Sequence, residues 1–229
     1  MLGGAAYSYP RDFLRAFPEA AIDVVEIDPG VTRLAREYFD LKDDARLLIV
    51  HEDARTFLNR NVEKYDLIFL DVFRSDSIPF HLTTRQAIAK LHAALSEKGV
   101  LLINVISAVE AERGEFLRAE IATLKKYFPQ VYVFAVSDAD NGSLAQNLMV
   151  AAFKSDEVPK FYSRDAETHG YLQHLWIKPI PEDMPALTDD FAPVDRYSMS
   201  ALSALKRLDY PILAHWKKIF GVRTEKRAE

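Results

Sequence analysis

The sequence YDLIFLD, residues 65–71, decides the fold, because a nearly unbroken apolar run here ends in the carboxylate Asp71. Such a run is typical of a strand that is buried on both faces, as strands are in parallel sheets. Two upstream runs have the same form: one ends in Glu26, and the other is followed by Asp53. The carboxyl ends of parallel strands share one edge of a sheet, where open α/β folds bind ligands. We therefore expect the three carboxylates to gather at that edge.

Helical patterns alternate with these runs over the first two-thirds of the chain. We expect parallel strands at 21–28, 46–52, 65–71 and 100–106. We expect helices at 10–17, 29–39, 54–61 and 109–127, and one from Thr83-Thr84 to about Gly99. A turn-rich loop, residues 138–143, predicts an antiparallel pair of strands at 131–137 and 148–154. The predicted class is α/β, with a Rossmann-like, mostly parallel twisted sheet, one antiparallel strand near its end and helices on both faces.

A Gly3-Gly4 turn precedes the carboxylates, and its glycines allow a ligand to approach the backbone. Glu26 lies 22 residues after Gly4, a spacing at which an acidic residue at a strand end accepts both hydroxyls of a ribose. The alternative is a surface carboxylate at a helix N-terminus, and we favour the ribose. We expect Ile27, which follows Glu26, to belong to the same nucleoside-binding site. We expect Asp28 to cap the next helix.

Asp53 and Ala54 suit an adenine, because a carboxylate accepts from the exocyclic amine and a backbone N–H donates to a ring nitrogen. Asp53 also suits the cap of helix 54–61, and the two roles conflict only in part. Asp71 faces the ligand crevice, and Asp76, five residues later, adds a second carboxylate. We expect this pair to hold a cationic amine. The alternatives are a loop cap for Asp71 and a solvated loop residue for Asp76.

The overall composition excludes several classes of protein. The 229 residues carry a formal charge of −5, which provides no basic face for nucleic acid. The absence of cysteine excludes disulfides and thiolate sites, and six scattered histidines predict no metal site. Apolar stretches are shorter than the roughly 18 residues that a bilayer requires. We expect a cytoplasmic location and no direct membrane insertion.

The chain divides near residue 154. Residues 1–154 contain the alternating pattern and are expected to form a nucleoside-binding domain. Residues 155–229 are rich in proline and are expected to form a C-terminal appendage on the same domain, irregular as far as Tyr197, with helices at 199–206 and 212–220. Only Met1-Leu2 precede the glycine turn, so the first, central strand is expected to be truncated. We therefore expect either that the chain is a fragment or that its first residue has been assigned too far downstream.

Four segments in this order resemble the spermidine synthase (polyamine aminopropyltransferase) family, within the S-adenosylmethionine-dependent methyltransferase-like superfamily. They are Gly3-Gly4, VVEID (24–28), EDARTFL (52–58) and YDLIFLD (65–71), and the resemblance covers roughly residues 1–154. IPFHLTT (78–84) and LTDDFAPVD (187–195) resemble the divergent bacterial branch, in which such a domain often follows a membrane-transporter-like region.

The resemblance implies a methyltransferase fold and the transfer of an aminopropyl group from decarboxylated S-adenosylmethionine to a polyamine acceptor. It implies that Glu26 holds the ribose, Asp53 holds the adenine and Asp71 is catalytic. The nucleoside is then a co-substrate, with no permanently bound cofactor. A homodimer is compatible with the resemblance, but the sequence does not locate an interface.

Two other functions stay open. A methyltransferase that uses intact S-adenosylmethionine fits the first two carboxylates equally well, and Ala6 stands where the family has an acidic residue against the amine of the donor. The truncated strand and altered loops also suit an inactive binding domain derived from a membrane-fused spermidine synthase-like protein.

Overall fold

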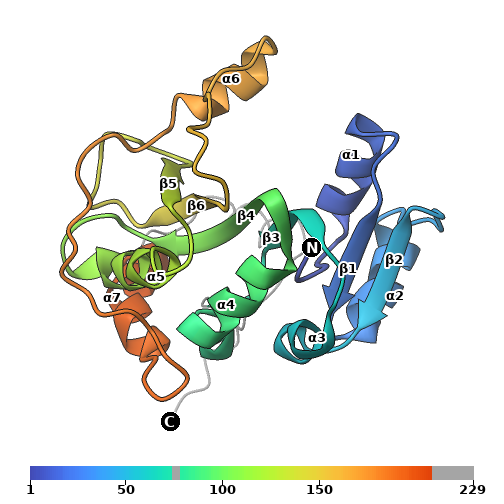
Figure 1. Ribbon diagram of the computed structural model, residues 1–229, viewed down its shortest axis with the longest axis horizontal. Coiled ribbons are helices and arrows are strands. Elements are labelled where there is room, and N and C mark those ends of the chain that lie inside the picture. The colour runs from blue at the N-terminus through green and yellow to red at the C-terminus, as the bar shows by residue number, and fades with distance from the viewer. Residues whose placement is uncertain (74–77, 208–229) are drawn as a thin grey trace, which may run out of the picture.

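A computed structural model describes residues 1–73 and 78–207 (Figure 1). Two parallel strands, β1 (Ile22–Glu26) and β2 (Leu47–His51), form one part of the sheet. The other part has the order β3-β4-β6-β5. Its strands are β3 (Tyr65–Leu70), β4 (Leu95–Ser107), β5 (Gln130–Ala135) and β6 (Gln146–Phe153). Strand β3 is parallel to β4, whereas β6 is antiparallel to both β4 and β5. The predicted sheet, with a reversed strand near its end, is confirmed.

Leu2 joins the two parts of the sheet. It forms parallel bridges to Val25 on one side and to Leu70 on the other. Its N–H donates to the carbonyl of Phe69 at 2.8 Å, and its carbonyl accepts from the N–H of Asp71 at 2.9 Å. These bonds place the glycine turn directly beyond the carboxyl ends of β1 and β3.

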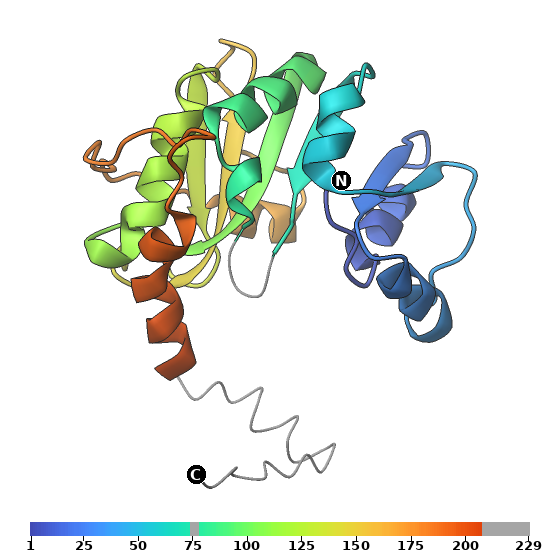
Figure 2. The same cartoon turned by 90° about the horizontal axis from the view of Figure 1, so that it is seen from below.

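Helices cover both faces of the sheet, as predicted (Figure 2). Two adjacent residues of β1, Val24 and Val25, contact helices on opposite faces of the sheet, because successive side chains of a strand point to opposite faces. Val24 is buried in a cluster with residues of α1 (Ser8–Ala16) and α2 (Pro29–Tyr38). Val25 is buried in the main cluster, with residues of α3 (Ala54–Arg60), α4 (Arg85–Ala94) and α5 (Glu115–Leu124).

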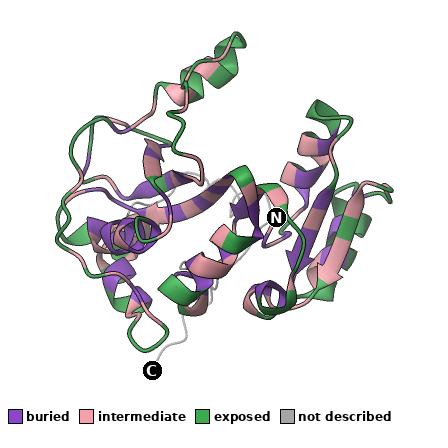
Figure 3. Ribbon diagram, viewed as in Figure 1, coloured by how far each residue is buried: buried purple, intermediate pink, exposed green. Residues whose placement is uncertain are grey.

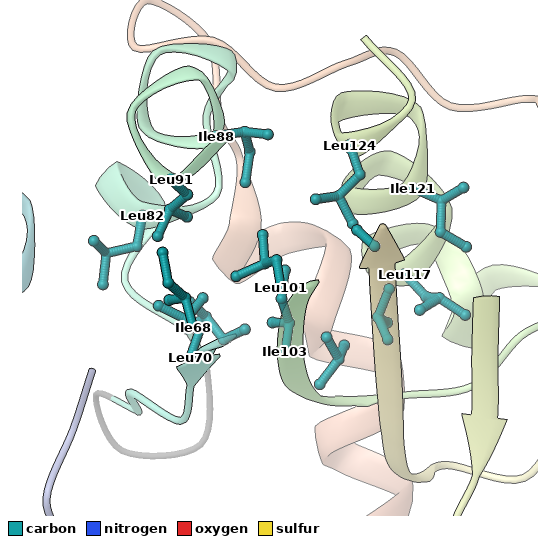
Figure 4. Packing of buried hydrophobic residues seen from close by; sticks show 14 of the residues in the cluster. Ile68, Leu70, Leu82, Ile88, Leu91, Leu101, Ile103, Leu117, Ile121 and Leu124 are labelled. Carbon is teal, nitrogen blue, oxygen red and sulfur yellow. The ribbon is translucent and has the colours of Figure 1, made fainter. Parts of the chain in front are cut away.

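The main core lies between α4, α5 and the strands β3 and β4, where buried positions alternate with less buried ones along β4 (Figure 3). Aliphatic side chains from these four elements, together with Leu82 from the turn before α4, pack against one another in Figure 4, which labels Ile68, Leu70, Leu82, Ile88, Leu91, Leu101, Ile103, Leu117, Ile121 and Leu124. Helix α7 (Val194–Arg207) contributes Val194 and Tyr197 to the same cluster, and Leu187 joins from the preceding segment. The core therefore extends into the proline-rich part of the chain.

The predicted end of the helix at Gly99 is wrong. Helix α4 ends at Ala94, and Gly99 lies within β4. The pairing with β3 shifts register here, since Tyr65 pairs with Leu95 but Leu67 pairs with Val100. Extra residues in one strand make a bulge, and glycine suits such a site. A Cβ on Gly99 would meet the side chain of Leu95 at 2.9 Å.

Two further segments differ from the prediction. The helix expected at 109–127 is a 3₁₀ turn, η2 (Glu112–Gly114), followed by the shorter α5. The segment expected to be irregular contains α6 (Ala166–Leu172) and the start of α7. Asp165 caps α6 by accepting from the N–H of Thr168, a local signal that the proline density obscured. The helix expected at 212–220 lies outside the described residues.

Candidate functional site

A cleft of about 1,040 Å³ opens at the carboxyl ends of β1 and β3. The side chains of Glu26, Asp53 and Asp71 all line it, together with Gly3. The structure thus brings together the carboxylates that end three separate apolar runs. In the described residues that line the cleft, acidic side chains outnumber basic ones: the lining includes Glu26, Glu52, Asp53, Asp71, Asp195 and His81. This excess of carboxylates suits a ligand that carries positive charge.

Gly3 is required at the floor of the cleft. Its φ is +90°, a left-handed conformation that side chains disfavour. A Cβ on Gly3 would lie 2.3 Å from the carbonyl oxygen of Asp71. A Cβ on Gly4 would lie 2.7 Å from the ring of Tyr7, which is fully buried and whose hydroxyl hydrogen-bonds Thr32 at 2.7 Å. The turn therefore leaves no space for a side chain at either position.

Glu26 is held rigidly in the wall of the cleft and is only 8% exposed. Its Oε2 accepts from the N–H of Gly4 at 2.8 Å, and its Oε1 accepts from the N–H of Asp28 at 2.9 Å. Each carboxylate oxygen can accept a second hydrogen bond. The side chain is thus fixed in place while it keeps capacity for two hydroxyls. Asp28 caps α2 by accepting from Gly30, as predicted.

Asp53 combines a cap with a position in the cleft. Its Oδ1 accepts from the N–H of Thr56 and caps α3, whereas its Oδ2 lies 3.4 Å from Nε2 of His81. Partial burial on its own would raise the pKa of Asp53, but the Thr56 N–H and the His81 ring outweigh it and hold the pKa below its ordinary value. Asp53 is therefore ionised at neutral pH, and Ala54 lies buried beside it.

Asp71 follows β3 and receives a hydrogen bond of 3.0 Å from Nδ2 of Asn104 on β4. Ile27 also lines the cleft and is 67% exposed. Asp76 lies outside the described residues. The structure therefore places in one cleft all of the predicted residues that it describes except Gly4, which lies directly behind the lining and holds Glu26.

Strand ends and turns in the sequence do not predict the opposite wall of the cleft. The segment around the 3₁₀ turn η1 (Phe80–Leu82) contributes Ile78 and His81, and α7 contributes Val194 and Leu202. No local pattern marks these residues as neighbours of Glu26. The available signals are the motifs IPFHLTT, which contains Ile78 and His81, and LTDDFAPVD, which contains Val194.

Arg55 connects the segments that form this wall of the cleft. Its guanidinium donates to the carbonyl of His81 at 2.8 Å and forms an ion pair with Asp189 at 2.9 Å. Thr84 caps α4 at the predicted start of this helix, and its hydroxyl donates to the carboxylate of Asp189 at 2.5 Å. The segment that enters α7 is thereby anchored to α3 and α4, which positions Val194 over the cleft.

The strand order and the position of the cleft define a methyltransferase-type α/β fold. The family model for the spermine/spermidine synthase domain matches residues 12–155, well over half of the chain. The chain belongs to this family.

Relatives with two kinds of activity resemble the chain. A polyamine aminopropyltransferase from Vibrio vulnificus is 31% identical over 153 residues, which cover 66% of this chain and 49% of that protein. An N-terminal histidine N-methyltransferase from Emericella nidulans is 34% identical over 142 residues, which cover 59% of this chain and 25% of that protein. The chain spans at most about half the length of these relatives.

The solved structure of a probable spermidine synthase from Corynebacterium glutamicum superposes with a TM-score of 0.63 at 26% identity. The match covers 79% of this chain and 63% of that one. Within residues 1–73 and 78–207, no helix combines the length and the apolar character needed to cross a membrane.

We expect Glu26→Gln to weaken the binding of an adenosine-based ligand by about 1.5–3 kcal/mol, the range for hydrogen bonds to a charged group. An amide has only one oxygen, so it cannot serve the N–H groups of Gly4 and Asp28 and also accept from two hydroxyls. Calorimetry with 5'-methylthioadenosine measures the loss. Glu52→Gln, which changes another carboxylate of the cleft lining, is the matched control. Unchanged affinity in a folded Glu26→Gln protein would remove Glu26 from the site.

Proposed function

We propose that this chain transfers an aminopropyl group from decarboxylated S-adenosylmethionine to a polyamine acceptor. The observation that carries the proposal is the convergence of Glu26, Asp53 and Asp71 on one acidic cleft beside the Gly3 turn. Membership of the spermine/spermidine synthase family supports the same reaction class.

In this proposal the nucleoside lies across the carboxyl ends of β1 and β3. Glu26 accepts from the two ribose hydroxyls, because its oxygens are oriented by backbone N–H groups. Asp53 accepts from the exocyclic amine of the adenine through Oδ2, and Ala54 lies next to the ring. Ile27, which is exposed at the rim, offers apolar contact to the base. The sulfonium and its propyl chain then point toward Asp71.

The acceptor amine attacks the propyl carbon that is bonded to the sulfonium. A new C–N bond forms, the C–S bond breaks, and its electron pair leaves with 5'-methylthioadenosine. Free amines of this type have a pKa of about 10 and are protonated at neutral pH, so the nitrogen must lose a proton to become a nucleophile. Asp71 attracts the cation and takes up the proton, while the fixed positions of donor and acceptor supply much of the remaining acceleration.

Transfer of a methyl group from intact S-adenosylmethionine is the second candidate. One observation favours it: Ala6 provides no carboxylate for the amine of a decarboxylated donor. The similarity to an N-terminal histidine N-methyltransferase supports it as well. The carboxylate of intact S-adenosylmethionine distinguishes the two donors chemically, so the binding preference of the cleft separates the two reactions.

The deciding experiment incubates the protein with putrescine and either donor, and follows the products by mass spectrometry. We expect 5'-methylthioadenosine and spermidine from decarboxylated S-adenosylmethionine, and no S-adenosylhomocysteine from the intact form. Calorimetry with each donor provides the second measurement. Tighter binding of the intact donor together with S-adenosylhomocysteine formation would establish methyl transfer. Absence of 5'-methylthioadenosine would overturn aminopropyl transfer, and failure to bind either donor in calorimetry would overturn both proposals.

A further inference from the structure

Three polar side chains from neighbouring strands form a continuous hydrogen-bonded relay that ends at Asp71. The Nδ2 of Asn147 on β6 donates to Oδ1 of Asn104 on β4 at 2.9 Å. The Nδ2 of Asn104 in turn donates to Oδ1 of Asp71 at 3.0 Å. The relay therefore runs from the exposed side chain of Asn147 to the carboxylate in the cleft.

The register of the sheet builds this relay. Leu70 pairs with Ile103 across β3 and β4, so the next residues along the two chains, Asp71 and Asn104, lie side by side. Asn104 pairs with Met149 across β4 and β6, and Asn147 lies two residues from Met149 on the same face. Such diagonal neighbours are within reach of polar side chains. The relay thus depends on the reversed strand β6 being next to β4.

Asn147 supports the orientation in which the amide nitrogen of Asn104 faces Asp71. An asparagine amide has an oxygen that accepts and a nitrogen that donates, and a half-turn exchanges them. The donor group of Asn147 engages the oxygen of Asn104, so the nitrogen of Asn104 is left to face the carboxylate. The carboxylate of Asp71 only accepts, so it favours the same orientation; without Asn147 the oxygen of Asn104 loses this partner and the amide is held less firmly.

We propose that Asn104 and Asn147 are positioning residues that orient the carboxylate of Asp71, with Oδ1 engaged by Asn104 and Oδ2 presented to the acceptor amine. Neither asparagine is among the residues that line the cleft, so both act through Asp71. This assignment rests on the proposed function, in which Asp71 meets the acceptor. A misplacement of a reacting group by about 1 Å is enough to lower a rate by roughly a hundredfold, so a fixed carboxylate matters for turnover.

The first test measures orientation directly, through crystal structures of Asn104→Ala and Asn147→Ala. We expect the Asp71 carboxylate to leave its rotamer in Asn104→Ala, and the Asn104 amide to shift in Asn147→Ala, with a smaller change at Asp71. This readout requires no activity, so it is independent of the proposed function. An unchanged Asp71 rotamer in both variants would overturn the inference.

The second test uses kinetics with decarboxylated S-adenosylmethionine and putrescine. We expect Asn104→Ala to lower kcat roughly tenfold to a hundredfold, a change of about 1.4–2.8 kcal/mol, and to leave the affinity for 5'-methylthioadenosine unchanged. Asn147→Ala should have a smaller effect on kcat. The double variant should match Asn104→Ala, because Asn147 acts only through Asn104.

Two controls separate positioning from a structural role. Asn104→Asp has nearly the same size but loses the donor, so we expect kcat to fall below that of Asn104→Ala although the side chain still fills its place. Asn61→Ala removes an amide that donates to the carbonyl of Glu63 outside the cleft, and should leave kcat unchanged. Additive losses from Asn104→Ala and Asn147→Ala, or an active Asn104→Asp protein, would contradict the relay. A wild-type protein that yields no 5'-methylthioadenosine would contradict the proposed function alone.

Discussion

Replacement of Asp71 by asparagine is expected to lower kcat by roughly 10²–10⁴-fold, the range for the loss of a positioned general base. The substitution keeps an oxygen that can accept from Asn104, so the local fold should persist. The new amide group carries no negative charge for a cationic acceptor, and it takes up no proton at neutral pH. Steady-state kinetics with saturating decarboxylated donor and putrescine measures the fall in kcat.

The affinity for the nucleoside separates a catalytic role from a binding role for Asp71. We expect Asp71→Asn to bind 5'-methylthioadenosine within about twofold of the wild type, since this ligand lacks the aminopropyl group that faces Asp71. Asp66→Asn is the matched control, because Asp66 is on the same strand, is exposed and accepts from the hydroxyl of Ser96. A large loss of nucleoside affinity in Asp71→Asn, or an unchanged kcat, would show that its role is misassigned.

Replacement of Glu120 by glutamine is expected to increase stability at neutral and alkaline pH. Glu120 lies in α5, is fully buried, and neither carboxylate oxygen has a hydrogen-bond partner within the described residues. Burial raises its pKa well above the ordinary value of 4.5. The native state therefore keeps this proton at pH values where the unfolded chain has released its own, so the unfolded state binds fewer protons.

The sign and size of the pH dependence follow from this difference. The stabilising contribution of the neutral carboxyl is fully present below pH 4.5, and it is lost as pH rises from there toward the raised native pKa. One proton corresponds to about 1.4 kcal/mol per pH unit. Urea unfolding of wild type and Glu120→Gln at several pH values between about 4 and 9 should give curves that converge at the acid end and diverge above it.

A nearby exposed carboxyl provides the control for Glu120. Glu112→Gln, in η2 just before α5, should produce no such divergence, because the side chain of Glu112 is exposed in the native state. A constant difference in unfolding free energy between Glu120→Gln and wild type across this pH range would show that Glu120 does not keep an extra proton in the native state.

The sequence predicted the carboxyl-end cluster because its signals are local. A strand buried on both faces must be apolar, and each such run stops where the chain reaches the edge of the sheet, so Glu26 and Asp71 mark that edge. The caps follow the same logic, since Asp28 and Thr84 bond to backbone groups only a few residues away. Gly99 misled the prediction because glycine marks helix ends and strand bulges alike.

The opposite wall of the cleft could not be predicted in this way. Arg55 and Asp189 are 134 residues apart in the sequence, and their ion pair exists only because α3, α4 and the segment before α7 pack together. The contact between His81 and Asp53 likewise forms only because the segment around His81 packs against α3. Pairings of this kind depend on how whole elements pack, which no local spacing records.

The sequence by itself determined the alternation of strands and helices, the glycine turn and the edge at which three carboxylates collect, because periodicity and turn chemistry act over a few residues. Only the tertiary structure decided that β6 inserts between β4 and β5, that α7 reaches the cleft, and that Asn147 and Asn104 meet Asp71. Strand register and the docking of distant elements depend on the combined packing of the whole core. A change of one residue in register would turn Asn104 to the other face of the sheet.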